Sequence, residues 1–318
     1  YCESLTSLTI PDSVTFIGNW PFEYCYDLKS VTIGNGITSI SKSAFRHCKS
    51  LTSVTIPDSV TYIDNWAFEG CESLESMTIP DSVTSIGMGT FQYCENLKSI
   101  TIPDSVTSIG NYAFQYCNSL ESIIIPDSIT SIGTVMFRNC ENLTNVTISD
   151  SVNFISSDAF NGCINLKYNE DDNKLYLGNE DNPYLVLVKV KDTSITSCEI
   201  NSKTKIILYN AFFYCESLTS ITIPDSVTSI GDGAFQHCSN LESITIPDSV
   251  TSIGGYTFSW CSSLTSVTIG SGVTSIGSGA FGNCDSLTNV TIPDNVTYIG
   301  DWLFEYCYNL KGVTIPDS

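Results

Sequence analysis

Cysteine is the residue type in this sequence whose spacing first suggests chemistry. The chain of 318 residues has 14 cysteines, and 13 of them recur at intervals of 23 residues in two runs. The runs are Cys2, Cys25, Cys48, Cys71, Cys94, Cys117, Cys140 and Cys163, then Cys215, Cys238, Cys261, Cys284 and Cys307. Cysteines in such numbers can form disulfides, hold a metal or react as thiolates. Because no Cys-x-x-Cys pair is present, we expect no metal site.

The periodicity itself favours buried, unbridged thiols. Identical residues on stacked coils point in the same direction rather than toward one another, so neighbouring cysteines are poorly placed to bond. Each also occupies an apolar place of its repeat, where free cysteine packs as a small hydrophobe. We therefore predict that Cys48 to Cys284 are reduced and inaccessible, with some disulfides as the alternative. Cys198 lies off the interval, in "ITSCEI", at a place where other repeats have valine.

Two histidines precede cysteines, at His47–Cys48 and His237–Cys238, and these are the residue types of a base and a nucleophile. Neighbouring side chains on a turn of helix point apart, and the cysteine is expected to face the core. We therefore expect no catalysis from either pair. No other acid–base constellation stands out, and the sequence predicts a protein that is not an enzyme.

The aspartate of the recurring tripeptide Pro-Asp-Ser, or of a close variant, is a third candidate. It occurs in nine repeats, at Asp12, Asp58, Asp81, Asp104, Asp127, Asp150, Asp225, Asp248 and Asp294. Stacked about 5 Å apart, such charges repel by less than about 1 kcal/mol per pair in water, which an exposed turn tolerates. We expect no cofactor, and the alternative is Ca²⁺ along this acidic edge. The acidic loops 169–173 and 179–182 are a second candidate place for Ca²⁺.

The charge balance excludes several classes of partner. Lys and Arg number 13 against 34 Asp and Glu, a formal net charge of −21. Such a chain is repelled by nucleic-acid phosphates and by anionic membranes, so we expect neither as a partner. No run of apolar residues approaches the ~18 that a transmembrane helix needs, and no membrane insertion is expected.

The repeat also indicates the elements that position these residues. In "LTSVTI" (51–56) the apolar residues alternate as in a strand, "PDS" (57–59) is typical of a turn, and "VTSI" (106–109) reads as a second short strand. In "GNYAFQYC" (110–117) a capping residue precedes apolar residues at i, i+1 and i+4, which predicts a helical turn. Phenylalanine occupies one place in all twelve repeats, from Phe22 to Phe304, and we expect an aromatic row in the core.

Stacking of such coils at about 4.8 Å predicts a repeat solenoid. We expect a right-handed coil with a parallel β-sheet along one side and short strands and helical turns on the other. Three segments are predicted: a block of seven full repeats in 1–165, a β-hairpin insert in 166–194, and a block of five full repeats plus a partial one in 195–318. The chain starts and stops within a repeat, so we expect a piece of a longer protein. We expect this piece to associate end to end or to fray at Tyr1–Phe22 and Phe304–Ser318.

The 23-residue pattern L-x-x-I-x-I-P-x-x-V-x-x-I-G-x-x-A-F-x-x-C is similar to the leucine-rich repeats of the BspA-like family, and the resemblance covers all twelve repeats. It implies a curved solenoid in a large surface or secreted protein of anaerobic bacteria or parasitic protists. The implied role is adhesion to host matrix or other cell-surface proteins, outside the cell or on its surface. The family shares no catalytic motif, so the resemblance assigns no catalytic residues.

The outward strand positions repeat Ser and Thr with little variety, whereas the edge around the predicted helical turn varies and is rich in aromatics. We predict that a protein partner binds this edge, because Tyr and Trp are enriched at binding hot spots. The candidate residues are Trp20, Tyr24, Trp66, Tyr93, Tyr112, Tyr116, Tyr256, Trp260, Trp302 and Tyr306. The alternatives are drift of surface residues, a structural spacer that binds nothing, and a Thr row that faces ice or polysaccharide.

Overall fold

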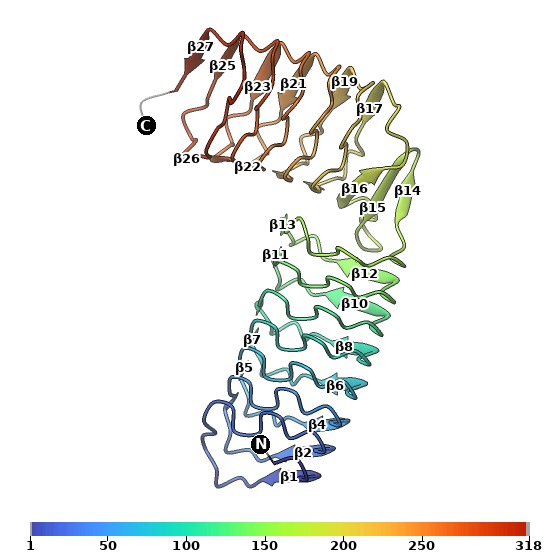
Figure 1. Cartoon of the computed structure of the whole chain (residues 1–318), viewed down its shortest axis with the longest axis vertical. Coiled ribbons are helices and arrows are strands. Elements are labelled where there is room, and N and C mark those ends of the chain that lie inside the picture. Colours follow the sequence, from blue (N-terminus) through green and yellow to red (C-terminus); the bar gives the residue numbers. More distant parts are fainter. Residues whose placement is uncertain (1, 316–318) are drawn as a thin grey trace. The chain divides into compact units, whose positions relative to one another are not determined.

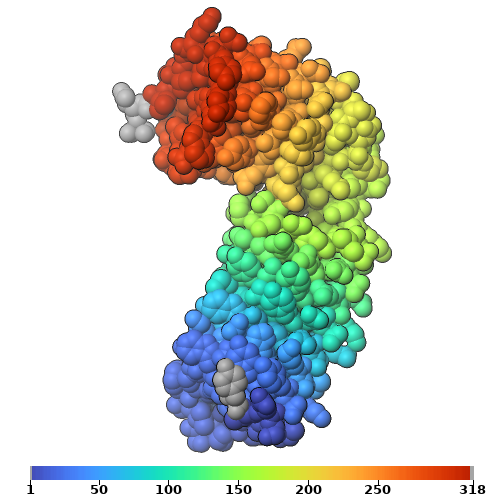
Figure 2. All heavy atoms as spheres, in the orientation of Figure 1, coloured from blue at the N-terminus to red at the C-terminus, as the bar shows by residue number. Residues whose placement is uncertain are grey.

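The structure is a computed structural model that describes residues 2–315. The chain divides into two compact units, Tyr1–Lys167 (unit 1) and Tyr168–Ser318 (unit 2). Within each unit, coils of the repeat lie one on the next, with a longer strand on one side of each coil (Figure 1). The colour bands of Figure 2 follow sequence order along each unit, since each coil packs against its neighbours in the chain.

The longer strands of unit 1 pair in parallel in three groups of neighbours, at a register of 23 residues. Thus Ser30 lies opposite Ser53 and Thr32 opposite Thr55, so identical positions are stacked. These strands are β1 (Ser7–Ile10), β2 (Ser30–Ile33), β4 (Ser53–Thr55), β6 (Ser76–Thr78), β8 (Ser99–Thr101), β10 (Ser122–Ile125) and β12 (Asn145–Ile148). Their Ser and Thr side chains face solvent while the residues between them face the core, as in β8, which confirms the predicted alternation.

A second, two-residue strand follows in each coil of unit 1 after the first, and these strands are also paired in parallel. These strands are β3 (Ser39–Ile40), β5 (Tyr62–Ile63), β7 (Ser85–Ile86), β9 (Ser108–Ile109), β11 (Ser131–Ile132) and β13 (Phe154–Ile155). The Pro-Asp-Ser turn between the two strands is closed by a backbone bond from Val60 N–H to Pro57 O at 3.0 Å. The parallel solenoid is therefore the fold that the repeat predicts.

Unit 2 begins with three antiparallel strands, β14 (Asn169–Asp171), β15 (Lys174–Leu177) and β16 (Val186–Val190). The pair β15–β16 is the expected hairpin, with a register shift between Leu175 and Tyr176. The loop "NEDDN" supplies β14 as a third strand, which the sequence analysis did not anticipate. β16 then pairs in parallel with a short strand of the first coil, so the hairpin continues the sheet of unit 2.

The remaining coils of unit 2 repeat the architecture of unit 1. The longer strands are β17 (Ser197–Glu199), β19 (Ser220–Thr222), β21 (Ser243–Ile246), β23 (Ser266–Ile269), β25 (Asn289–Thr291) and β27 (Gly312–Thr314). The shorter ones are β18 (Ile206–Ile207), β20 (Ser229–Ile230), β22 (Ser252–Ile253), β24 (Ser275–Ile276) and β26 (Tyr298–Ile299). Together with the hairpin, the shorter strands form one eight-stranded sheet.

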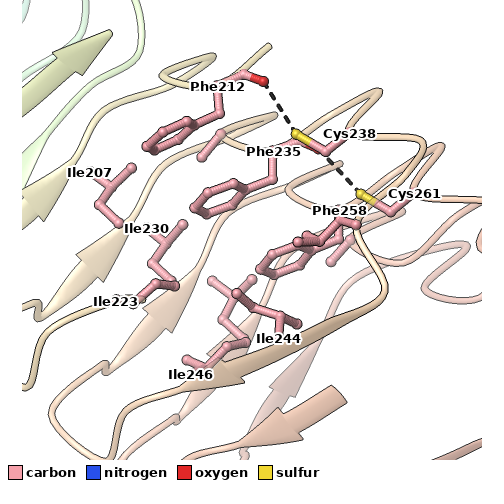
Figure 3. Close-up of a cluster of buried hydrophobic side chains, with 14 of the residues drawn as sticks. Ile207, Phe212, Ile223, Ile230, Phe235, Cys238, Ile244, Ile246, Phe258 and Cys261 are labelled. Carbon is pink, nitrogen blue, oxygen red and sulfur yellow. Dashed lines mark hydrogen bonds between the residues drawn. The ribbon is translucent and has the colours of Figure 1, made fainter. Parts of the chain in front are cut away.

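The core of each unit contains the expected row of phenylalanines. Successive rings stack face to face, from 4.9 Å between the Phe212 and Phe235 centroids to 5.8 Å between Phe281 and Phe304. Figure 3 shows Phe212, Phe235 and Phe258 in this row, with isoleucines from both sets of strands packed beside them. The rings from Phe45 to Phe137 and from Phe212 to Phe281 are fully buried, so packing alone accounts for the phenylalanine of the repeat.

The cysteines form a second buried row, and all 14 are free thiols. Each regular cysteine from Cys48 to Cys284 is buried, whereas Cys198 is half-buried, so the predicted burial is wrong for Cys198. The thiol of Cys261 donates to the carbonyl of Phe235 at 3.3 Å (Figure 3), and that of Cys94 donates to Phe68 at 3.2 Å. Burial raises the pKa of Cys261 to about 12, so this thiol is unreactive as well as apolar.

The predicted helical turn is wrong: the described residues contain no helix, and "GNYAFQYC" forms a series of tight turns. In the coil of unit 1 around Trp66, alternate amides bond in different directions. The N–H groups of Trp66, Phe68 and Gly70 donate to carbonyls of the next coil at 2.8–2.9 Å, while those between them donate within their own coil. In a helix every one of these amides would donate within its own coil. The hydrogen bonds that this segment makes to the next coil would then be lost.

Candidate partner-binding edge

Turning alternate amides outward brings left-handed backbone to two places in the coils, with Asp158, at the first place of its coil, as the exception. Of the 24 residues with positive φ in the described part of the chain, 23 fall at these two places, which we call the first and second columns. The first column contains Trp20, Ser43, Trp66, Gly89, Tyr112, Val135, Asn210, Gly233, Tyr256, Gly279 and Trp302. The second contains Tyr24, His47, Gly70, Tyr93, Tyr116, Asn139, Gly162, Tyr214, His237, Trp260, Asn283 and Tyr306. Together the columns form the aromatic edge.

All ten residues predicted as partner-binding lie in these two columns, with φ between 53° and 64°. Left-handed backbone costs a side chain with a Cβ about 1–2 kcal/mol, and Gly or Asn adopts it more readily. The columns do contain Gly and Asn in several coils, as at Gly89 and Asn139. Tyr and Trp are therefore present at positions where the backbone conformation favours Gly or Asn. Some favourable interaction of these side chains must offset the backbone strain.

The first column alternates aromatic and small residues in its first five coils, from Trp20 to Tyr112. A Cβ built on Gly89 would lie 2.6 Å from Cδ1 of Trp66, so the indole lies over this glycine. The ammonium group of Lys42 lies 5.5 Å from the ring centroid of Trp20 and 5.0 Å from that of Trp66. The two indoles, two coils apart, thus hold one cation between them by cation–π attraction.

In unit 2 the second column is an uninterrupted stack over three coils. The ring of His237 lies 4.3 Å from Tyr214 and 5.5 Å from Trp260, centroid to centroid, with interplanar angles of 8° and 13°. The outer rings remain accessible, with 47% of Tyr214 and 49% of Trp260 exposed. Tyr214 and Trp260 therefore cover the two faces of the His237 ring, and both remain partly exposed to solvent.

In unit 1 the same column is interrupted. Tyr24 stacks on His47 at 5.1 Å, and Tyr93 stacks on Tyr116 at 4.8 Å. Between the two pairs stands Gly70, which has no side chain to continue the stack. A cavity of about 400 Å³ occupies this place. It is lined by Tyr24, Tyr26, His47, Lys49, Gly70, Glu72, Tyr93 and Glu95.

The charges around this cavity are mostly negative. The ammonium group of Lys49 is paired with Glu72 at 2.8 Å, which raises the pKa of Lys49. Glu95 on the opposite rim is exposed, and the ion pairs found among residues 2–315 do not include it. Burial lowers the pKa of His47, with Glu69 as the largest opposing influence. His47 is therefore a neutral ring at pH 7.

The strand side of the coils offers a different surface. The outward Ser and Thr of β4, β6 and β8 are all exposed and lie in register with one another. Their hydroxyls are already solvated, so a partner gains little by covering them. Only a few residues, such as Ile124 at 66% exposure, break this uniformity. The chemistry of this surface is therefore nearly uniform along these strands.

The His–Cys pairs lack the arrangement that catalysis needs. The Cys48 thiol is buried and donates to the carbonyl of Phe22 at 3.2 Å, and burial raises its pKa to about 12. His47 and His237 instead stack in the second column. Each histidine is thus part of the aromatic edge, and neither has an activated thiol beside it.

The acidic candidates for Ca²⁺ are dispersed. Asp12 accepts the backbone N–H of Asn35 at 2.7 Å, and Asp248 accepts that of Ser271 at 2.7 Å. Within residues 2–315 no three His, Cys, Asp or Glu side chains group as metal ligands would. A cavity of about 640 Å³ beside β17 includes Asp171 and Asp172 of the insert loop. Calcium binding remains a prediction for these places.

Sequence reasoning selected the aromatic residues but missed their neighbours. It set aside His47 and His237, and it did not consider Lys42 or Gly70. The signal was available, because comparison of the repeats shows Gly and Asn alternating with Tyr and Trp at the same two places. That mixture is typical of positive φ, and it distinguishes a left-handed position from a helical one.

Comparisons with known proteins agree with the repeat fold. The profile of the family described as "BspA type Leucine rich repeat region (6 copies)" matches residues 1–118, 67–176 and 190–311. Among solved structures, a leucine-rich repeat protein from Bacteroides ovatus has 31% identity and a TM-score of 0.54, and the match covers 98% of this chain and 81% of that one. A leucine rich cell surface protein from Faecalibacterium prausnitzii has 36% identity and a TM-score of 0.46, with 100% and 81% covered.

A comparison with curated proteins gives no match. The described part of the chain also offers no helix with the length and apolar character that crossing a bilayer requires.

Proposed function

This chain belongs to the BspA-type leucine-rich repeat family, and from that premise we propose that it is a non-catalytic solenoid that binds a protein partner along its aromatic edge. The observation that carries the proposal is the backbone at the ten candidate residues, all of which have positive φ. Gly or Asn would fit these places at lower cost. A binding role supplies the offsetting gain, since a buried Tyr or Trp anchor contributes about 2 kcal/mol or more at a hot spot.

The class of partner follows from the resemblance and the charge. We propose a host matrix protein or another cell-surface protein, bound outside the cell, because the BspA-like resemblance implies adhesion. The net charge of −21 favours a partner with a basic surface. Limited proteolysis of intact cells checks the location: digestion of this protein without lysis supports it, and protection until lysis contradicts it.

The test of the binding face compares two double variants in unit 1. Binding to immobilised matrix proteins and serum proteins is measured with and without Ca²⁺. Trp66→Ala with Tyr112→Ala removes two first-column anchors, and we expect at least about a tenfold loss of affinity. Ser53→Lys with Ser99→Lys alters the strand side and should change affinity little. Loss of binding in the lysine pair alone would place the site on the sheet.

A structural spacer is the second candidate, and the uniform Ser/Thr register of the strands favours it. A spacer needs only rigidity and solubility from its surface. It predicts that neither double variant changes any interaction of the protein. Retention of a partner by the wild type, with loss in the Trp66 and Tyr112 pair, rejects the spacer.

A further inference from the structure

The aromatic edge of unit 1 has a cavity where the second column is interrupted at Gly70. The His47 ring lies directly over Gly70, because a Cβ built on this glycine would collide with its Nδ1. Tyr93 belongs to the next stacked pair, with Tyr116. The cavity of about 400 Å³ lies along the same column and is lined by both His47 and Tyr93. We call this cavity the Gly70 slot.

The slot lies between rings of two coils that are separated by the coil of Gly70. The backbones of these two coils are roughly 10 Å apart at about 4.8 Å per coil, and the His47 ring leans from one of them toward Gly70. The rings of each flanking pair are nearly parallel, at 15° for Tyr24 and His47 and 10° for Tyr93 and Tyr116. A flat group inserted midway would therefore stack on an aromatic face at either side. A tetrahedral group would leave part of both faces uncovered.

The rim of the slot selects for positive charge. Glu72 and Glu95 both line it, and the only cation among the lining residues, Lys49, is already paired with Glu72. Glu95 is exposed and available as an acceptor. His47 adds no repulsion because it is held neutral at pH 7. The combination of π faces and carboxylates attracts a cation.

The first column of the same unit provides an internal precedent. There Ser43 stands between Trp20 and Trp66 as Gly70 stands between His47 and Tyr93. The chain fills that gap with its own cation, since Lys42 lies within 5.5 Å of both indole centroids. At Gly70 the nearest lysine is committed to an ion pair. The gap at Gly70 is therefore not filled by a cation of this chain, and a cation of a bound partner can enter it.

We propose that the Gly70 slot binds the guanidinium group of an arginine side chain on the protein partner. This rests on the proposed function, because the arginine belongs to a protein bound along the edge. Guanidinium is planar, stacks on aromatic faces and pairs with carboxylates through a fixed set of N–H donors. An ammonium group has the charge without the plane, and a neutral amide has the plane without the charge. Among protein side chains at pH 7, guanidinium matches both features of the slot, since histidine is mostly neutral there.

The test uses three short peptides of one design, acetyl-Gly-X-Gly-amide, in which X is arginine, lysine or citrulline. The chain has two histidines, so its imidazole C–H signals report on two places by NMR. His47 lines the slot, and His237 lies between two rings of unit 2 and serves as the internal reference. We expect the arginine peptide to shift the His47 signal alone. Its affinity should be about two- to fivefold higher than that of the other two peptides.

Variants locate the effect. Gly70→Tyr fills the slot with a ring. Tyr93 and Tyr116 show that tyrosine adopts this left-handed conformation, and the His47 ring has to turn away from the new Cβ to admit it. We expect this variant to lose the arginine response. Asn283→Tyr adds a ring at the same column of unit 2 and should leave the response intact. Glu95→Gln changes no packing and should lower the affinity for the arginine peptide while leaving the citrulline peptide unaffected.

Equal affinity for the arginine and citrulline peptides would overturn the guanidinium assignment, and so would an unchanged response in Gly70→Tyr or an equal shift of His237. If Gly70→Tyr fails to fold, the Glu95→Gln comparison decides alone. The outcome is separable from that of the proposed function. If a partner needs Trp66 and Tyr112 but none of the peptides binds, the slot proposal is rejected and the proposed binding edge is retained.

Discussion

Both units place a histidine in the second column, but only His237 has an aromatic ring on each side. His47 has Tyr24 on one side and Gly70 on the other. The backbone is the same in the two places, with φ of 56° at His47 and 62° at His237. The fold therefore fixes where the side chains of the column project. The residue type at one position of each coil decides whether neighbouring rings stack on one another. Unit 2 has a closed stack, and unit 1 has an open one.

The largest expected effect separates the rings of the aromatic edge from the buried phenylalanine rings of the core. The comparison fails if both kinds of ring stabilise the fold equally. Phe68→Ala removes a fully buried ring of the inner row and should lower the free energy of unfolding by about 3–5 kcal/mol. Trp66→Ala, two residues away, removes a half-buried ring and should cost about 1 kcal/mol or less. Urea denaturation of both variants measures the difference. Similar losses would make Trp66 a structural residue.

A second test of the comparison is to convert the closed stack into an open one. Trp260→Gly leaves His237 beside a glycine, as His47 is beside Gly70. We expect the arginine peptide to shift the His237 signal in this variant, although it does not in the wild type. Asn283 would stand where Tyr93 stands, and Ser262 and Asp285 would replace Glu72 and Glu95 on the rim. The guanidinium would then stack on one ring only and meet one carboxylate, so the response should be several-fold weaker than that of the Gly70 slot. The titration that tests the slot measures this directly.

Failure of Trp260→Gly to respond, in a folded protein, would mean that the vacancy alone is insufficient. Stability is a useful control here. Loss of the stacked ring costs about 0.5–1.5 kcal/mol, while relief of left-handed strain returns about 1–2 kcal/mol. The two nearly cancel, so this variant should unfold at almost the wild-type denaturant concentration.

The smallest expected effect is the pH dependence of His47. Burial lowers its pKa in the folded state, opposed by Glu69 and Glu23 and assisted by Arg46 and Lys49. The unfolded chain titrates near pH 6.5 and so binds the proton more readily. This contribution to stability is therefore complete above pH 6.5 and is lost as the pH falls toward the folded pKa.

A matched variant isolates that contribution. His47→Asn places in the column a residue that other coils already have, as at Asn139. Between pH 7 and pH 5 the wild type should lose slightly more stability than this variant, measured by urea denaturation in the same buffers. A larger loss in the variant would show that protonated His47 is stabilised in the fold, contrary to the lowered pKa.

The repeat made most of the fold predictable, because twelve copies of one unit act as an alignment within a single chain. Alternation in "LTSVTI" predicted the strands, and the invariant phenylalanine predicted the inner row. The helical turn was wrong for a definite reason. Spacing of Ala113, Phe114 and Cys117 fits one face of a helix, but coil-to-coil hydrogen bonds require positive φ at Tyr112 and Tyr116.

The candidate edge was predictable as a set of residues and not as a geometry. Aromatic content and variability pointed to all ten positions. Whether two of them touch depends on how each ring leans toward the next coil, as Tyr256 does over Gly279, where a Cβ would lie 2.6 Å from Cε1. That lean is a property of the left-handed backbone. The Gly70 slot and the bridging role of Lys42 therefore required the structure.

The central claim is that the aromatic residues of the edge are present for binding, at a cost in stability. The most direct measurement is the urea unfolding midpoint of a triple variant, Tyr112→Asn with Tyr256→Asn and Trp302→Asn, in which the first column receives a residue that it already has at Asn210. Relief of about 1 kcal/mol of strain at each site should offset the lost ring contacts. We predict a midpoint equal to or above that of the wild type. A fall corresponding to several kcal/mol would show that these rings hold the solenoid together.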